Sequence, residues 1–351
     1  GNPMVYTLGE AAKATGKSKA TISKAIKSGR ISASKDDTGA FRIDPSELHR
    51  VYPPTPKGEQ EETPKETPVN TTETGDFKAF ELNQTATFVT EYKKSEGKSS
   101  NVVGYIEGSD PKLKEEAIVF TAHYDAFGIE NGKIYNGAAD NALGTAEMLA
   151  VAEGYLAMNL KPKRSMIFLA VTGEEYDLYG SRYWATNPTW DITKVSANLN
   201  LDGIGTEIYA PVKKFVGYGA EFSSLGQMLE DVTSAYGLEV IPDPLPEERG
   251  FYRSDPYSFV EKGIPSLMLM GGPDVTKEAF IKQIKTWEKS HYHQATDDTT
   301  NKWHWEGAKT VADIMGIMGY RLANQEEMPE WLKTERFADL KRGNTKKLIE
   351  Q

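Results

Sequence analysis

Short apolar runs alternate with segments of helical periodicity through most of this chain. Buried strands are expected at residues 85–90, 101–108, 117–122, 166–171, 197–201 and 266–270. Helices are expected at residues 142–155, 179–185, 223–236 and 306–322. This alternation predicts a three-layer α/β/α domain, in which helices cover both faces of a mostly parallel central sheet.

The first fifty residues follow a different pattern. Helices are expected at residues 8–16 and 18–29, a hairpin at 31–43, and another short helix from Pro45 onwards. Two helices joined by so short a turn indicate a helix-turn-helix, with the hairpin as its wing.

A segment rich in Pro, Thr and Glu follows at residues 53–76. It contains almost nothing apolar, so burial could not offset the entropy of ordering it, and a flexible linker is expected. The predicted domains are therefore a helix-turn-helix domain at 1–52, the linker at 53–76, an α/β domain at 77–330 and a C-terminal tail at 331–351.

Composition excludes several kinds of protein. The net charge of −10 over 351 residues argues against a protein that coats nucleic acid over its whole surface, although a local basic module stays open. Because the chain has no Cys, a transition metal must be held by His and carboxylate ligands. No apolar run is long enough to span a membrane, and the first residues lack the pattern of a signal peptide.

Acidic residues and histidines stand where predicted strands end. His123 follows residues 117–122, Glu174 and Glu175 follow 166–171, and Asp202 follows 197–201. The carboxyl ends of neighbouring parallel strands meet in one crevice. Asp140, in a strand-to-helix crossover, and the histidine-containing loop 291–297 are expected to join them. This set of ligands suits zinc. Taken singly, the Glu pair is equally typical of surface charge, and Asp140 of a helix N-cap.

Six ordered motifs resemble the two-zinc aminopeptidases related to those of Streptomyces and Aeromonas. The motifs are HYDAFG, NGAADNALGTAEML, VTGEEYDLYGSRYW, NLNLDGIG, RSDPYSFVEKGIPSLML and YHQATDD, and the resemblance extends over residues 84–324. It implies an exopeptidase of the fold predicted above, with two Zn²⁺ per chain and peptides as substrates.

The resemblance also implies a role for individual residues. Asp140 would bridge the two ions, His123 and Asp202 would complete one site, and Glu175 and His293 the other. Glu174 would be the general base for a zinc-activated water that attacks the N-terminal peptide bond. Tyr292 would donate to the oxyanion, and Asp125 would hold the ring of His123. Arg253 or Asp255 would help to hold the substrate main chain.

Other functions remain open. A carboxypeptidase or dipeptidase of the same fold needs a cationic pocket, which Arg253 could supply, and glutaminyl cyclases are one-zinc relatives. A regulator that senses peptides and binds DNA is a different class of alternative.

The N-terminal segment resembles the helix-turn-helix domains of excisionase-like and plasmid replication proteins. That resemblance implies DNA contacts from Lys19, Thr21, Lys24, Lys27 and Arg42, with Lys17 and Ser23 as further candidates. These side chains could equally form the solvated face of a small helical domain. Relatives of the peptidase domain are expected to be secreted or periplasmic, but their signal peptide and protease-associated domain are not recognisable here, so the compartment stays open.

Overall fold

The computed structural model describes residues 5–36, 39–52, 96–203, 205–333, 335–346 and 348. The predicted linker at 53–76 and the strand expected at 85–90 lie outside the described residues. The chain divides into two compact units, Gly1–Tyr92 and Lys93–Gln351, and each is described by itself.

The first unit contains the elements that the sequence predicts. They are α1 (Leu8–Thr15), α2 (Lys19–Lys27), β1 (Ala33–Lys35), β2 (Phe41–Ile43) and α3 (Pro45–Val51). The side chain of Thr7 caps α1 together with Glu10, and Gly16 ends the helix in a left-handed conformation. Ser18 caps α2, and β1 and β2 pair antiparallel.

A small apolar core holds this unit together. It is formed by the buried residues Ala11, Ala12, Ile22, Ala25, Ile31, Ile43 and Leu48. Each helix contributes apolar side chains on one face only, which leaves the lysines of α2 on the outside.

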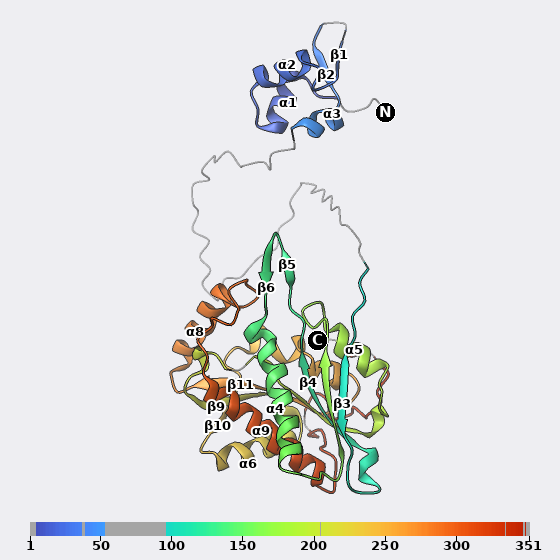
Figure 1. Cartoon of the computed structure of the whole chain (residues 1–351), viewed down its shortest axis with the longest axis vertical. Coiled ribbons are helices and arrows are strands. Elements are labelled where there is room, and N and C mark those ends of the chain that lie inside the picture. The colour runs from blue at the N-terminus through green and yellow to red at the C-terminus, as the bar shows by residue number, and fades with distance from the viewer. Residues whose placement is uncertain are drawn as a thin grey trace. The chain divides into compact units, whose positions relative to one another are not determined.

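The second unit is built on a seven-stranded sheet (Figure 1). Its strands are β3 (Val102–Ile106), β4 (Ala117–His123), β7 (Ser165–Val171), β8 (Val195–Asn200), β9 (Val212–Tyr218), β10 (Glu239–Ile241) and β11 (Ser266–Pro273). They lie in the order β10-β9-β11-β8-β4-β7-β3. Among the described strands, β3 with β7 and β9 with β11 are the antiparallel pairs, so the sheet is mostly parallel, as predicted.

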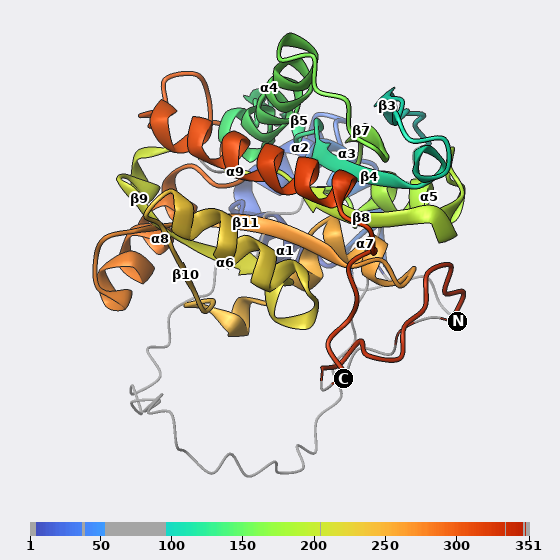
Figure 2. The same cartoon turned by 90° about the horizontal axis from the view of Figure 1, so that it is seen from below.

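Helices cover both faces of this sheet. They are α4 (Leu143–Ala157), α5 (Tyr179–Thr186), α6 (Leu225–Ala235), α7 (Pro256–Val260), α8 (Lys277–Ser290) and α9 (Trp305–Asn324). Figure 2 shows α4, α6 and α9 along one face, and α5 packs with α7 against the other. The predicted three-layer α/β/α architecture is confirmed.

The central strand β4 shows why three layers are needed. All seven of its residues are buried. Ile118 and Phe120 face the core under α4 and α9, whereas Ala117 and Val119 face the core that contains Trp184. A strand buried on both faces is typical of a parallel sheet between helical layers.

Several elements were not expected from the sequence. These are the sheet strands β9 and β10, the helices α7 and α8, and a hairpin of β5 (Gly128–Glu130) and β6 (Lys133–Tyr135). Figure 1 shows the hairpin projecting beyond the end of the sheet. Short 3-10 segments at Leu113–Glu115, Ile192–Lys194, Glu207–Tyr209, Ala220–Phe222, Pro246–Glu248 and Gly250–Arg253 lie in the connections.

The described part of the segment predicted as a C-terminal tail packs on this unit. Phe337 is buried in a cluster with Phe251 and Tyr257. Arg342 donates hydrogen bonds to the carbonyls of Val195 and Ser196 beside the sheet. Among the described residues, no helix is long and apolar enough to cross a membrane.

Candidate metal centre and active site

Three adjacent strands of the sheet bring the acidic residues and histidines together. His123 is the last residue of β4, the Glu174-Glu175 pair follows β7, and Asp202 follows β8. Since β8, β4 and β7 are neighbours in the sheet, their carboxyl ends open on one crevice. The crossover between β4 and α4 adds Asp140, whose backbone is not helical, within the kinked segment Ala138–Ala142.

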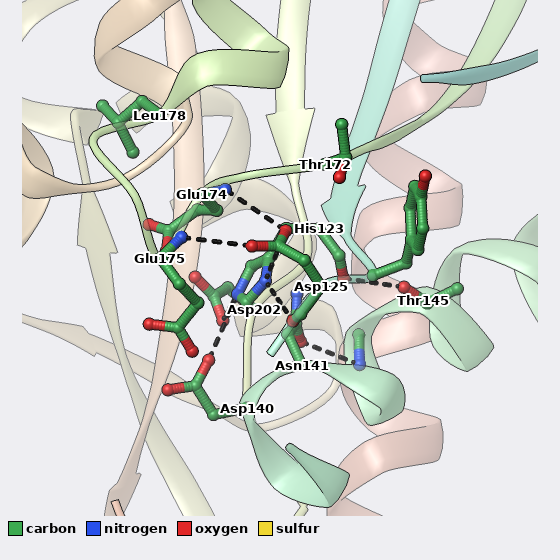
Figure 3. Close-up of polar contacts among 12 residues, drawn as sticks. His123, Asp125, Asp140, Asn141, Thr145, Thr172, Glu174, Glu175, Leu178 and Asp202 are labelled. Carbon is green, nitrogen blue, oxygen red and sulfur yellow. Dashed lines mark hydrogen bonds and ion pairs between the residues drawn. The ribbon is translucent and has the colours of Figure 1, made fainter. Parts of the chain in front are cut away.

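One group of ligand atoms is formed by His123, Asp140 and Asp202. His123 Nε2 lies 3.1 Å from Asp140 Oδ1 and 3.6 Å from Asp202 Oδ1. Figure 3 shows these side chains converging. Burial would lower the pKa of His123, but the carboxylates of Asp202, Asp125 and Asp140 raise it well above its usual value.

A second group is formed by Asp140, Glu175 and His293. His293 Nε2 lies 3.0 Å from Glu175 Oε2 and 3.4 Å from Asp140 Oδ2. Although burial opposes it, the carboxylates of Asp140 and Glu175 raise the pKa of His293 to about 9. Asp140 therefore offers one oxygen to each group, as a bridging carboxylate must.

The donor atoms fit zinc. Ligands about 2.1 Å from a tetrahedral zinc ion lie roughly 3.4 Å from one another, and the separations here run from 3.0 to 3.6 Å. His123 Nε2 is buried and makes no hydrogen bond, even though two carboxylates are near it. A buried ring nitrogen aimed between two carboxylates without a hydrogen bond is the arrangement that a cation would satisfy.

Asp125 connects the two sides of the site. Its carboxylate accepts hydrogen bonds from the backbone N–H groups of Glu174 at 3.2 Å and Glu175 at 3.4 Å (Figure 3). The sequence predicted that this carboxylate would hold the ring of His123. It lies 3.7 Å from Nδ1, and the nearer acceptor is the backbone carbonyl of Asp125, at 3.3 Å. A proton on Nδ1 leaves Nε2 free for a metal.

Glu174 lies where an acid or base would act. It lines the two cavities that meet at the site. Burial raises the pKa of Glu174 to about 10, and the nearby carboxylates of Asp255, Asp202 and Asp140 add to the effect. Cations bound among these carboxylates would lower the pKa of Glu174 again, which would leave it able to accept a proton.

Two residues that sequence reasoning missed hold the crossover loop. Asp297, 2% exposed, accepts hydrogen bonds from the backbone N–H groups of Ala139 and Asp140. The side chain of Asn141 donates to Leu201 O at 3.0 Å and accepts from the N–H of Gly203 at 3.0 Å. Both residues fall inside motifs quoted above, which was the available signal.

The remaining predicted residues take different positions. Tyr292 and Arg253 line both cavities beside Glu174, and burial together with Asp140 raises the pKa of Tyr292. Asp255 is fully buried and lines neither of these cavities, so its predicted contact with substrate stays a prediction.

Of the residues predicted to contact DNA, Ser23 is half-buried and the others are exposed. Lys19, Thr21, Lys24 and Lys27 lie on α2, and Arg42 on β2. The hydroxyl of Thr21 is 2.9 Å from that of Ser18 at the N-terminus of the helix, which gives Thr21 a structural role as well.

Comparison with known proteins gives the family. The model of peptidase family M28 matches residues 101–317. The chain belongs to peptidase family M28. Leupeptin-inactivating enzyme 1 of Streptomyces exfoliatus is 28% identical to this M28 chain over 209 residues, which are 57% of the chain and 43% of that enzyme. A vacuolar membrane protease of Clavispora lusitaniae is 33% identical over 129 residues, 36% of the chain and 12% of that protein.

The fold of this M28 chain has solved counterparts. A zinc aminopeptidase from Bacillus subtilis superposes with a TM-score of 0.51 at 20% identity, over 70% of this chain and 53% of that one. The chain spans less than half the length of the two relatives named above. Family membership and the two ligand groups agree with the predicted two-zinc centre.

Proposed function

We propose that the chain is a two-zinc aminopeptidase, which hydrolyses the N-terminal peptide bond of peptides. The observation that carries this proposal is the pair of ligand groups that share Asp140, with Glu174 beside them in the lining of a cavity. His123 and Asp202 would complete one zinc site, and Glu175 and His293 the other. In such a site the ions act as Lewis acids and make water reactive near neutral pH.

The protein groups would divide the remaining work. Glu174 accepts a proton from the attacking water at a carboxylate oxygen as the bond from oxygen to the peptide carbon forms. It returns that proton to the leaving amine nitrogen as the carbon–nitrogen bond breaks. Tyr292, which lines the same cavity, donates its hydroxyl hydrogen to the carbonyl oxygen as negative charge develops there. Arg253 binds the substrate main chain from the wall that both cavities share.

Hydrolysis of a panel of aminoacyl p-nitroanilides by the full chain tests this function. We expect turnover that disappears with a chelator, returns with zinc, and is absent when the substrate amine is acetylated. Turnover of acetylated peptides from their carboxyl end would instead indicate a carboxypeptidase. A zinc-loaded chain that hydrolyses no member of the panel would overturn the proposal.

We also propose that the N-terminal unit is a helix-turn-helix module that binds DNA. The support is the short turn between α1 and α2, the hairpin β1–β2 and the exposed cations on α2. Lys24→Ala and Lys27→Ala in the full chain should each weaken binding to duplex DNA and reduce the salt dependence by about one ion. Lys13→Ala on α1 serves as the control. Binding that neither α2 variant changes would refute the proposal.

A further inference from the structure

A cavity of about 190 Å³ adjoins the metal centre within the second unit. It opens beside Asp140, Glu174 and Asp202, and its wall is mainly apolar or aromatic. Tyr209, Met268, Met270, Phe280, Ile284 and Trp287 form much of this wall. The residues at 280, 284 and 287 recur on one face of α8, so the cavity is built by a regular element.

Carboxylates gather on the same cavity away from the metal ligands. Asp243, Glu248 and Glu288 line it, and the one cationic side chain among its lining residues is Arg253. Asp243 is half-buried, and its Oδ1 accepts a hydrogen bond from the N–H of Leu245 at 2.8 Å. This bond fixes the carboxylate in the wall.

The charges of these groups do not cancel. Arg253 donates to the backbone carbonyl of Glu248 at 3.3 Å and also faces the second cavity. Lys277 lies near Asp243 but outside the lining, and it is exposed, as Glu248 and Glu288 are. Apart from the metal ligands and Glu174, the cavity is lined by three carboxylates and one cation. This part of the cavity therefore carries a net negative charge.

We infer that this cavity selects N-terminal residues with a long apolar stem and a cationic head, namely Lys and Arg. The inference rests on the proposed aminopeptidase function. Two cavities adjoin Glu174. We place the side chain of the first residue in this one because its wall is mainly apolar, whereas Arg182, Arg249 and Arg253 line the other.

Both parts of such a side chain find matching surroundings. The methylenes contact Met268, Met270 and the aromatic rings, while the charged head meets carboxylates such as Asp243 and Glu288. Aromatic faces also attract cations. An N-terminal Glu would meet carboxylates instead, and Leu would leave them without a partner.

Matched substrates test the inference. The zinc-loaded full chain should hydrolyse Lys- and Arg-p-nitroanilide with kcat/KM roughly tenfold above Leu-p-nitroanilide, and the Glu derivative least well. Asp243→Asn and Glu288→Gln should each lower the ratio of Lys to Leu turnover roughly fivefold. Glu278→Gln, on the same helix but outside the lining, should leave that ratio unchanged. Asn at 243 keeps an oxygen for the N–H of Leu245.

The outcomes separate this inference from the proposed function. A ratio that favours Leu, or that neither cavity variant changes, would overturn the inference while the chain remained an aminopeptidase. If no substrate is hydrolysed, the proposed function fails, and calorimetry with free L-lysine and L-norleucine then tests the cavity alone. Tighter binding of lysine that Asp243→Asn abolishes would support the inference, and equal binding would refute it.

Discussion

The carboxylate of Asp297 accepts a hydrogen bond from the backbone N–H of Asp140, 3.1 Å away. The other oxygen of Asp297 binds the N–H of Ala139 at 2.9 Å and the side chain of Asn301 at 2.6 Å. A loop that follows α8 thus fixes the residue shared by both ligand groups. Asp297 acts on the metal centre without offering it a ligand atom.

Replacing Asp297 by Ala should weaken both the fold and the metal site. Buried N–H groups lose their acceptor, so we expect a loss of about 1–3 kcal/mol of stability and less zinc bound per chain. Thermal unfolding and metal analysis measure the two effects. Asp298→Asn, at the adjacent position, is the control. A variant with normal unfolding and normal zinc content would show that the contact is dispensable.

Glu174→Gln should abolish most activity while the metal centre stays intact. The amide cannot accept a proton from water, and general-base catalysis typically contributes about 10²–10⁴-fold. Glu174 supplies no atom to either ligand group, so zinc content should stay at the level of the unmodified chain. The kcat of the zinc-loaded variant measures the effect, and near-normal turnover would remove Glu174 from the mechanism.

Asp125→Ala should lower zinc affinity although Asp125 belongs to neither ligand group. The carboxylate of Asp125 accepts hydrogen bonds from the N–H groups of Glu174 and Glu175 and so orients both residues. The substitution removes this acceptor. Replacing a residue that supports a metal ligand typically lowers metal affinity or activity by about 10–100-fold. Competition with a chelator measures zinc affinity directly. Asp177→Asn is the control, at an exposed position beyond the pair whose left-handed backbone Asn tolerates. Equal zinc affinity in both variants would contradict the prediction.

Glu147 should make stability fall as pH rises. This residue of α4 is 4% exposed, and both of its carboxylate oxygens lack a hydrogen-bond partner. Burial, with the charge of Asp202, raises its pKa well above the usual 4.5. The unfolded chain therefore loses a proton that the folded chain keeps, so folding weakens from about pH 4.5 up to the folded pKa and then levels off.

Glu147→Met removes this group at similar volume. With a chelator present, the variant should be more stable by about 1–3 kcal/mol, and its advantage should grow with pH in that window. Melting temperatures from pH 5 to 9 measure it. A difference between the two proteins that stays constant with pH would show that Glu147 does not titrate between folded and unfolded states.

Most strands and helices that carry the site can be predicted from the local pattern of apolar and polar residues. The run 117–122 is wholly apolar or small, and its burial between two layers makes β4 recognisable. The strand β9 has only an irregular pattern, VKKFVGY, because it lies near the sheet edge and is partly exposed. Helix α8 was missed although Phe280, Ile284 and Trp287 are spaced as on one helical face.

The metal ligands can be predicted from the sequence more readily than the residues that hold them in place. His123, Asp140 and Asp202 were placed by their positions at strand ends and in a crossover. The hydrogen bonds of Asp297 and Asn141 join backbone groups far apart in the chain, and no local pattern encodes such a contact. The carboxylates of the adjoining cavity, Asp243 and Glu288, do not both follow strands of the sheet. Their proximity therefore cannot be predicted from the positions of strand ends.

The contact between Asp297 and Asp140 also bears on the order in which the site forms during synthesis. When a ribosome has produced the chain only as far as α8, Asn141 can already bind Leu201, but the acceptor for the N–H of Asp140 is missing. His293 and Asp297 emerge next, ahead of α9, and complete the second ligand group and the hydrogen bond to Asp140 together. A chain that ends before them would lack one ligand of the second group and the residue that holds the loop of Asp140.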